Sequence, residues 1–211
     1  MIRFLVGGIV LGIELEYKLH IADQAELERV LASAEIEAVR IAPWKQTRMK
    51  TTYFDTADRR FSERHWTLRH RTENGIGIVC LKTPLPDRRA RGEWQIEADA
   101  PDLDAIERLL RCGAPQELVW MYGDGQLFPV CGAEFLRKSA MLEFADGSRA
   151  EAAGDCGKLF GPTEALPFAE LELELYRGTS EATKALAAAL CSAYGLHEEP
   201  LSKVARARRL K

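Results

Sequence analysis

The segment Ile13-Glu-Leu-Glu-Tyr-Lys-Leu19 alternates apolar and charged side chains without a break, a period of two that is typical of a β-strand. Arg91–Ala98 and Ala169–Leu175 repeat this alternation. Asn74-Gly75 and Asp146-Gly147 each separate two further candidate strands, and both dipeptides favour the positive φ angles of a tight hairpin turn. We therefore expect a mostly antiparallel sheet.

Three amphipathic segments predict helices between the strands. The first opens on Asp23-x-x-Glu26, an acidic relative of the capping box, and the other two end before glycines. Strands with a few separate helices predict the α+β class. The predicted helices are Asp23 to about Ser33, Asp102 to Cys112 and Ser180 to Tyr194.

The overall composition narrows the choice of partner and compartment. The chain has 211 residues, 46% of them hydrophobic, and a net charge of −3, so no basic footprint for nucleic acid is expected. Its five cysteines are widely spaced and contain no CxxC pair. This pattern indicates reduced thiols, argues against a zinc site or a disulfide framework, and favours a cytoplasmic location.

The first eleven residues contain a short apolar run with a single arginine. The run is too short to span a bilayer, lacks a small-residue cleavage site and leads directly into a charged strand. We interpret residues 1–11 as an N-terminal extension and residues 12–211 as a single domain. No membrane partner is expected.

The charges of the strands are sorted by sign. Glu170, Glu172 and Glu174 place three carboxylates on one strand face, about 7 Å apart. Like charges at this spacing repel one another, and a purely structural strand would interleave lysines. Such a strand indicates a cationic neighbour or a bound metal ion. The first strand carries a related face: Glu14, Glu16 and Lys18.

Basic side chains follow other strands in the same way. Arg69 and Arg71 share one face of a candidate strand, and Lys82 lies on the next strand. Arg91 lies on a third strand, on the same side as Glu93 and Glu97. Carboxylates suit Mg²⁺ or Mn²⁺, whereas Arg and Lys suit phosphate oxygens. A metal-bridged phosphate chain is the ligand that requires both. The alternative is a two-sided sheet whose charged faces are merely solvated and salt-bridged.

If the charged faces converge, the apolar faces must point outward and be covered by the helices. This arrangement is a closed or nearly closed barrel of about eight strands with a polar, charged lumen. The side chains expected on the outer face are Leu15, Tyr17, Trp94, Ile96, Leu171 and Leu173.

The motifs resemble those of a known family. Glu14-Leu-Glu-Tyr-Lys18 is similar to the ExExK strand of the triphosphate tunnel metalloenzymes, or CYTH superfamily, and Arg91-Gly-Glu-Trp94 resembles its bacterial inorganic triphosphatase branch. Other similar segments follow in family order: Tyr53–Thr56, Leu68–Arg71, Leu81–Thr83, Leu127–Val130 with Arg137, Glu151–Gly157, Glu170–Glu174 and Ser202–Arg206.

The resemblance implies roles for individual residues. It implies that Glu14, Glu16 and Lys18 act in catalysis with two of the three late glutamates, of which Glu170 and Glu172 are favoured. The implied metal ligands are Glu14, Glu16, Glu170, Glu172 and Asp155, with Glu93, Glu97, Glu151 and Glu174 at a second site that Gln95 weakens. The implied substrate contacts are Lys18, Arg69, Arg71, Lys82, Arg91, Arg137, Lys203 and Arg206.

The expected activity is hydrolysis of the terminal phosphate of a small triphosphate, foremost inorganic tripolyphosphate, with Mg²⁺ or Mn²⁺ and in a monomer or homodimer. A class IV adenylyl cyclase or a thiamine triphosphatase in the same tunnel remains an alternative. So does a non-catalytic polyphosphate-binding module, although a pure anion binder gains nothing from so many glutamates. The motifs contain no Ser–His or Cys–His pair, so a covalent intermediate is not expected.

Several polar residues are given structural roles. The four histidines are scattered, and a lone histidine on a strand or loop is more often structural than catalytic. Asp55 is interpreted as a turn residue and Arg208, Arg209 and Lys211 as a solvated tail. The histidines are His20, His65, His70 and His197.

Overall fold

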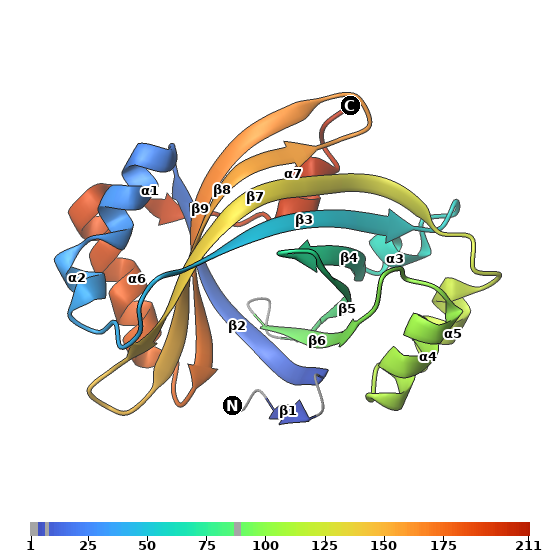
Figure 1. Cartoon of the computed structure of the whole chain (residues 1–211), viewed down its shortest axis with the longest axis horizontal. Coiled ribbons are helices and arrows are strands. Elements are labelled where there is room, and N and C mark those ends of the chain that lie inside the picture. Colours follow the sequence, from blue (N-terminus) through green and yellow to red (C-terminus); the bar gives the residue numbers. More distant parts are fainter. Residues whose placement is uncertain (1–3, 7–8, 87–89) are drawn as a thin grey trace.

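The computed structural model describes residues 4–6, 9–86 and 90–211, and eight of its strands close into an antiparallel barrel (Figure 1). The order around the barrel is β2-β6-β5-β4-β3-β7-β8-β9, and β9 pairs with β2 to close it. The predicted α+β barrel is thereby confirmed. Its strands are β2 (Ile9–Ile21), β3 (Lys45–Asp55), β4 (Thr67–Glu73), β5 (Ile76–Pro84), β6 (Ala90–Glu97), β7 (Phe128–Glu143), β8 (Arg149–Phe160) and β9 (Ala165–Arg177).

The strand β2 pairs with two different strands along its length. Its first half, through Leu15, pairs with β6, and its second half, from Glu16 onward, pairs with β9. Two short strands, β1 (Phe4–Val6) and β10 (His197–Glu198), also pair with β2. Since β2 begins at Ile9, it starts within the stretch that was interpreted as an N-terminal extension.

The three predicted helices are present as α1 (Gln24–Leu31), α4 (Leu103–Arg111) and α6 (Glu181–Tyr194). Asp23 and Asp102 cap the first two by accepting a hydrogen bond from a backbone N–H of the first turn. Four shorter helices were not predicted, because four to six residues are too few to show a helical period. These are α2 (Ala34–Glu37), α3 (Arg60–Glu63), α5 (Glu117–Tyr122) and α7 (Lys203–Ala207).

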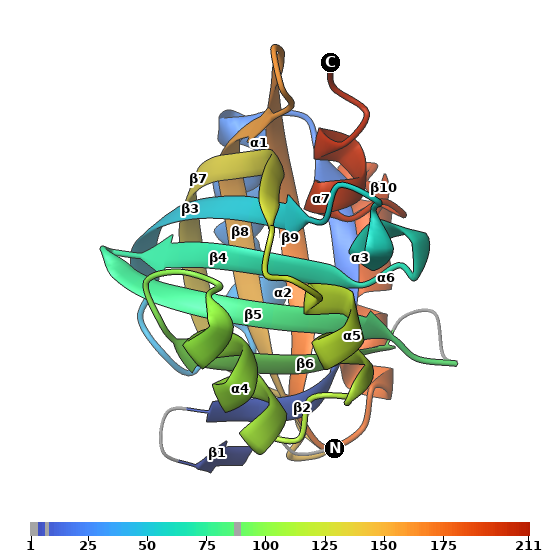
Figure 2. The ribbon, with the colours of Figure 1, turned by 90° about the vertical axis from the view of Figure 1, so that its right-hand side faces the viewer.

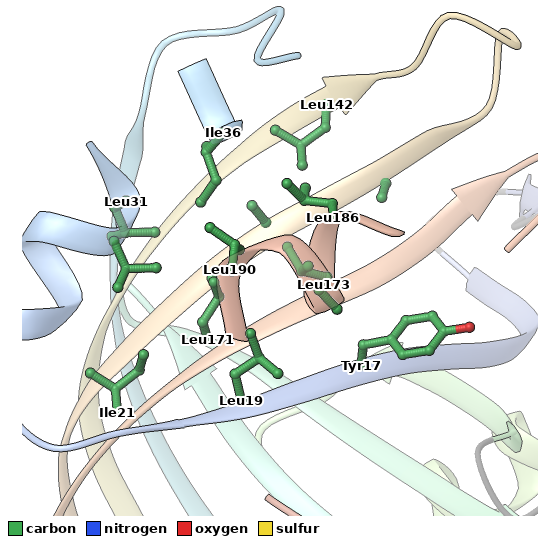
Figure 3. Close-up of a cluster of buried hydrophobic side chains, with 14 of the residues drawn as sticks. Tyr17, Leu19, Ile21, Leu31, Ile36, Leu142, Leu171, Leu173, Leu186 and Leu190 are labelled. Carbon is green, nitrogen blue, oxygen red and sulfur yellow. The ribbon is translucent and has the colours of Figure 1, made fainter. Parts of the chain in front are cut away.

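Two apolar clusters cover the outside of the barrel. Tyr17, Leu171 and Leu173 lie in the first, beneath α1, α2 and α6 (Figure 3). Ile96 is buried in the second, where Trp94 is partly buried, beneath α3, α4 and α5 (Figure 2). These outward orientations agree with the sequence pattern, whereas Leu15 is half-buried and belongs to neither cluster.

A third apolar cluster lies on the lumen side and was not predicted. Phe135 and Phe168 pack there edge to face, with ring centroids 5.6 Å apart, against Val204 of α7. Helix α7 packs against β7 and β8 and so fills one end of the barrel (Figure 1). Within the described ranges, no helix combines the length and the apolar character needed to cross a membrane.

Candidate active site

Inward-facing side chains of the strands line a cavity of about 450 Å³. Alternate positions of β2 contribute Glu14, Glu16 and Lys18, as the period of two requires. Glu97 is exposed and does not line this cavity, and neither do Asp155, Glu170 and Arg206. The other predicted site residues that line it are Arg69, Arg71, Lys82, Arg91, Glu93, Arg137, Glu151, Glu172, Glu174 and Lys203.

One carboxylate group in the cavity consists of Glu14, Glu93 and Glu174, all three buried, with one oxygen of each within 4.8 Å of the others. Lys82 Nζ lies 2.6 Å and 2.5 Å from the two Glu14 oxygens and 3.6 Å from Glu93. Burial raises the pKa of Glu14. The positive charge of Lys82 lowers this pKa, whereas the negative charges of Glu93 and Glu16 raise it further. Arg69 Nη2 also lies 3.6 Å from Glu93, so three carboxylates of this group face two cations, Lys82 and Arg69.

The strand register decides which late glutamate joins this group. Glu16 is paired with Glu174, and Lys18 is paired with Glu172. Glu170 is consequently two residues further along β9, opposite His20. The member of β9 that approaches Glu14 is thus Glu174, for which the family resemblance implies only a place at a second site.

A second carboxylate group consists of Asp155, Glu170 and Glu172. Arg137 holds Asp155 through two hydrogen bonds of 2.7 Å and donates a third, of 2.6 Å, to Glu172. The fork-like contact with Asp155, which is fully buried, fixes the guanidinium firmly on β7.

Helix α7 brings two more cations to the same group. Lys203 Nζ lies 2.7 Å from Asp155 and 2.8 Å from Glu172 and also contacts Glu170, to which Arg206 donates a hydrogen bond. Burial raises the pKa of Glu170 to about 7 despite Lys203. Burial also tends to raise the pKa of Glu172. The positive charges of Lys203 and Arg137 outweigh this effect and hold the pKa of Glu172 well below its usual range. Three cations thus neutralise this group from within the protein.

The strand β4 forms a basic wall of the cavity. Arg69 and Arg71 have side chains only 13% and 12% exposed, and the Nε atom of each is buried with no hydrogen-bond partner among the described residues. Burial and the neighbouring Arg69 both lower the pKa of Arg71. The terminal nitrogens do have partners, since Arg69 Nη2 lies 3.6 Å from Glu93 and Arg71 Nη2 contacts Glu73.

The structure adds Arg208 to the cavity lining, which corrects its interpretation as part of a solvated tail. Its Nη2 atom lies 3.3 Å from Asp55 Oδ2. The side chain of Asp55 also accepts hydrogen bonds from the backbone N–H groups of Thr56, Phe61 and Ser62. Asp55 is therefore a structural residue that joins β3, α3 and the C-terminal segment. No sequence signal identified Arg208, because its position depends on this distant contact.

We expect Asp55→Ala to destabilise the protein by about 3 kcal/mol or more, because it leaves buried backbone donors without partners. Urea unfolding followed by circular dichroism would measure this change. Thr163→Ala, at an exposed position of the β8–β9 turn, is the control and should be neutral. An Asp55→Ala protein as stable as the wild type would contradict the structural role.

The closed antiparallel barrel encloses a cavity that is lined by both carboxylates and basic side chains. Residues 12–207 match the CYTH domain. The chain therefore belongs to the CYTH domain family.

Solved structures of low sequence identity share the fold. A protein from Hippeastrum, described as a candidate adenylyl cyclase with a dominant triphosphatase activity, is 20% identical with a TM-score of 0.60, over 93% of this chain and 95% of the other. A candidate adenylate cyclase from Bacillus halodurans is 16% identical with a TM-score of 0.56, over 92% and 95%. A protein from Pyrococcus horikoshii is 17% identical with a TM-score of 0.53, over 92% and 97%.

Proposed function

We propose that the protein hydrolyses the terminal phosphate of a small triphosphate, with inorganic tripolyphosphate as the preferred substrate and Mg²⁺ or Mn²⁺ as the cofactor. The observation that carries the proposal is the shared cavity, which is lined both by a group of buried carboxylates and by the basic side chains of Arg69 and Arg71. Membership of the CYTH family supports an activity on triphosphates.

The donor set fits a hard divalent cation. The ion would be held by Glu14, Glu93 and Glu174, because all of their ligand atoms are carboxylate oxygens. Glu16, the neighbouring inward-facing residue of β2, would be a further ligand. Such an ion, when bound, polarises a phosphoryl oxygen and makes a bound water more acidic. The Asp155 group fits less well, since Arg137, Lys203 and Arg206 already neutralise it.

The basic residues would bind and orient the phosphate chain. Arg69 and Arg71 offer fork-like donors along one wall, and Lys82 beside them completes that wall. Arg137 and Lys203, held in place by Asp155, would neutralise negative charge from the other side. This positioning and charge neutralisation constitute most of what phosphoryl transfer requires of a protein.

No residue of the cavity wall needs to act as a nucleophile. The thiol of Cys80 lies 3.3 Å from Glu93, but burial raises its pKa to about 11, so it stays protonated at neutral pH. Direct attack by water is therefore the route that the site supports. Phe135 of β7 and Val204 of α7 form an apolar part of the cavity wall.

The proposal predicts faster release of orthophosphate from tripolyphosphate than from ATP or thiamine triphosphate, with Mg²⁺ or with Mn²⁺. A cavity of this size, ringed by charged groups, gains little from an organic moiety. Phosphate release and product identification by chromatography would measure the preference. Cyclic AMP as the main product from ATP would replace the hydrolase with a cyclase, and binding without turnover would indicate a polyphosphate-binding module.

A further inference from the structure

Lys203 of α7 lies among three carboxylates at the position that a metal ion would take. Its Nζ atom is 2.7 Å from Asp155 and 2.8 Å from Glu172, and it also contacts Glu170. These three residues, here called the Asp155 group, each place one oxygen within 4.8 Å of the others. An ammonium group has three donors and no acceptor, so each N–H of Lys203 has one carboxylate to which it can donate.

The charges of the Asp155 group are balanced from within the protein. Arg137 pairs with two of the three carboxylates, and Arg206 pairs with the third. Together with Lys203, three cations face three carboxylates, which offsets part of the cost of burying them. A divalent ion added to this group would create an excess of positive charge. The group around Glu14 differs, because its three carboxylates face only two cations.

Lys203 also separates part of the Asp155 group from the cavity. Lys203 and Glu172 line the cavity, whereas its described lining does not include Asp155 or Glu170, which are fully buried. All three carboxylates of the group around Glu14, in contrast, line the cavity. An ion that enters through the cavity therefore reaches the carboxylates around Glu14 directly, but meets the ammonium of Lys203 in front of Asp155.

We propose that the ammonium group of Lys203 takes the place of a second metal ion, so that the protein binds a single divalent ion, at the carboxylates around Glu14. The inference rests on the proposed function only for this one ion. The Asp155 group holds Lys203, and with it α7, in place of the metal that the family resemblance implies there. Since Lys203 is part of the chain, its positive charge is present before any metal or substrate binds.

Titration of Mn²⁺ into the full-length protein without substrate, with free Mn²⁺ measured by electron paramagnetic resonance, would count the bound ions. We expect one Mn²⁺ per wild-type chain. Lys203→Ala should bind one more, because the three oxygens that contacted Nζ lose their shared donor and become open to the cavity. The double variant Lys203→Ala/Asp155→Asn should lose this additional ion. Thermal unfolding would confirm that each variant is folded.

The control is Lys158→Ala, which removes an exposed lysine of β8 outside the cavity lining and should bind Mn²⁺ as the wild type does. Two ions of similar affinity per wild-type chain would overturn the proposal, and this count decides the case even if Lys203→Ala does not fold. A folded Lys203→Ala that binds no more ions than the wild type, or an equal gain in Lys158→Ala, would also overturn it.

The same counts separate this proposal from the proposed function. A wild type without bound Mn²⁺ and a Lys203→Ala protein with one ion would contradict the metal site at Glu14 but support the role of Lys203. Because the readout is binding of the metal alone, it does not depend on whether the protein hydrolyses tripolyphosphate.

Discussion

Glu14→Gln is expected to reduce the turnover of tripolyphosphate by about 1,000-fold while the metal-free protein remains as stable as the wild type. Glu14 belongs to the group that would hold the divalent ion, and such an ion supplies several kcal/mol of transition-state stabilisation. A buried carboxyl with a raised pKa destabilises the fold once pH rises above its usual pKa, because ionisation is then easier in the unfolded chain. Removing this charge at pH 8 relieves that cost but deprives the buried Lys82 of its carboxylate partner, so the two effects oppose each other and the net change in stability should be small.

The response to ligand separates a metal-binding residue from a merely structural one. Metal and tripolyphosphate together should stabilise the wild type by about 2.7 kcal/mol at a hundredfold excess over the dissociation constant. For a chain of this size the melting temperature should rise by about 5–10 °C. Glu14→Gln should lose most of this rise. The control, Glu97→Gln, alters an exposed glutamate outside the cavity and should behave as wild type. Equal shifts in all three proteins would contradict the metal assignment.

Arg69→Ala and Arg71→Ala are each expected to lower kcat/KM for tripolyphosphate by about 10- to 100-fold. Each removes charge-assisted hydrogen bonds worth about 1.5–3 kcal/mol, and every 1.36 kcal/mol is a factor of ten in rate. Arg71→Lys should recover only part of the activity, because an ammonium group lacks the planar fork of a guanidinium. Steady-state kinetics at fixed free Mg²⁺ would measure these effects.

Lys211→Ala provides the matched control for loss of a positive charge. The side chain is exposed at the C-terminus, where the backbone N–H and carbonyl of this residue make the contacts with the β8–β9 turn. Its activity should therefore stay at the wild-type level. An equal loss in Lys211→Ala and Arg69→Ala would indicate a general effect of charge and would remove the support for a basic wall on β4.

The barrel and its charged lumen were predictable because a β-strand exposes alternate residues to opposite faces. That rule placed Glu14, Glu16 and Lys18 together on one side of β2 and Tyr17 on the other, as found. Sorted charge on several strands then indicated a common interior. Local sequence was sufficient for these features because they depend on neighbours two residues apart.

The features that the sequence did not predict depend on contacts between distant segments. Pairing of β2 with β9 selects Glu174 over Glu170 as the neighbour of Glu14, and an isolated strand with three equivalent glutamates carries no information on this register. Arg208 lines the cavity through its contact with Asp55, which is 153 residues away in sequence. Helix α7 has only five residues and was therefore too short to be predicted as a plug of the barrel.

The central claim is that one cavity holds a divalent ion on carboxylates and a triphosphate on arginines. A crystal structure with Mn²⁺ and tripolyphosphate, with data collected for the anomalous signal of manganese, tests this claim most directly. We predict an anomalous peak among Glu14, Glu93 and Glu174, with the phosphate chain against Arg69 and Arg71. A phosphate chain bound outside the cavity, or manganese remote from these three carboxylates, would contradict it.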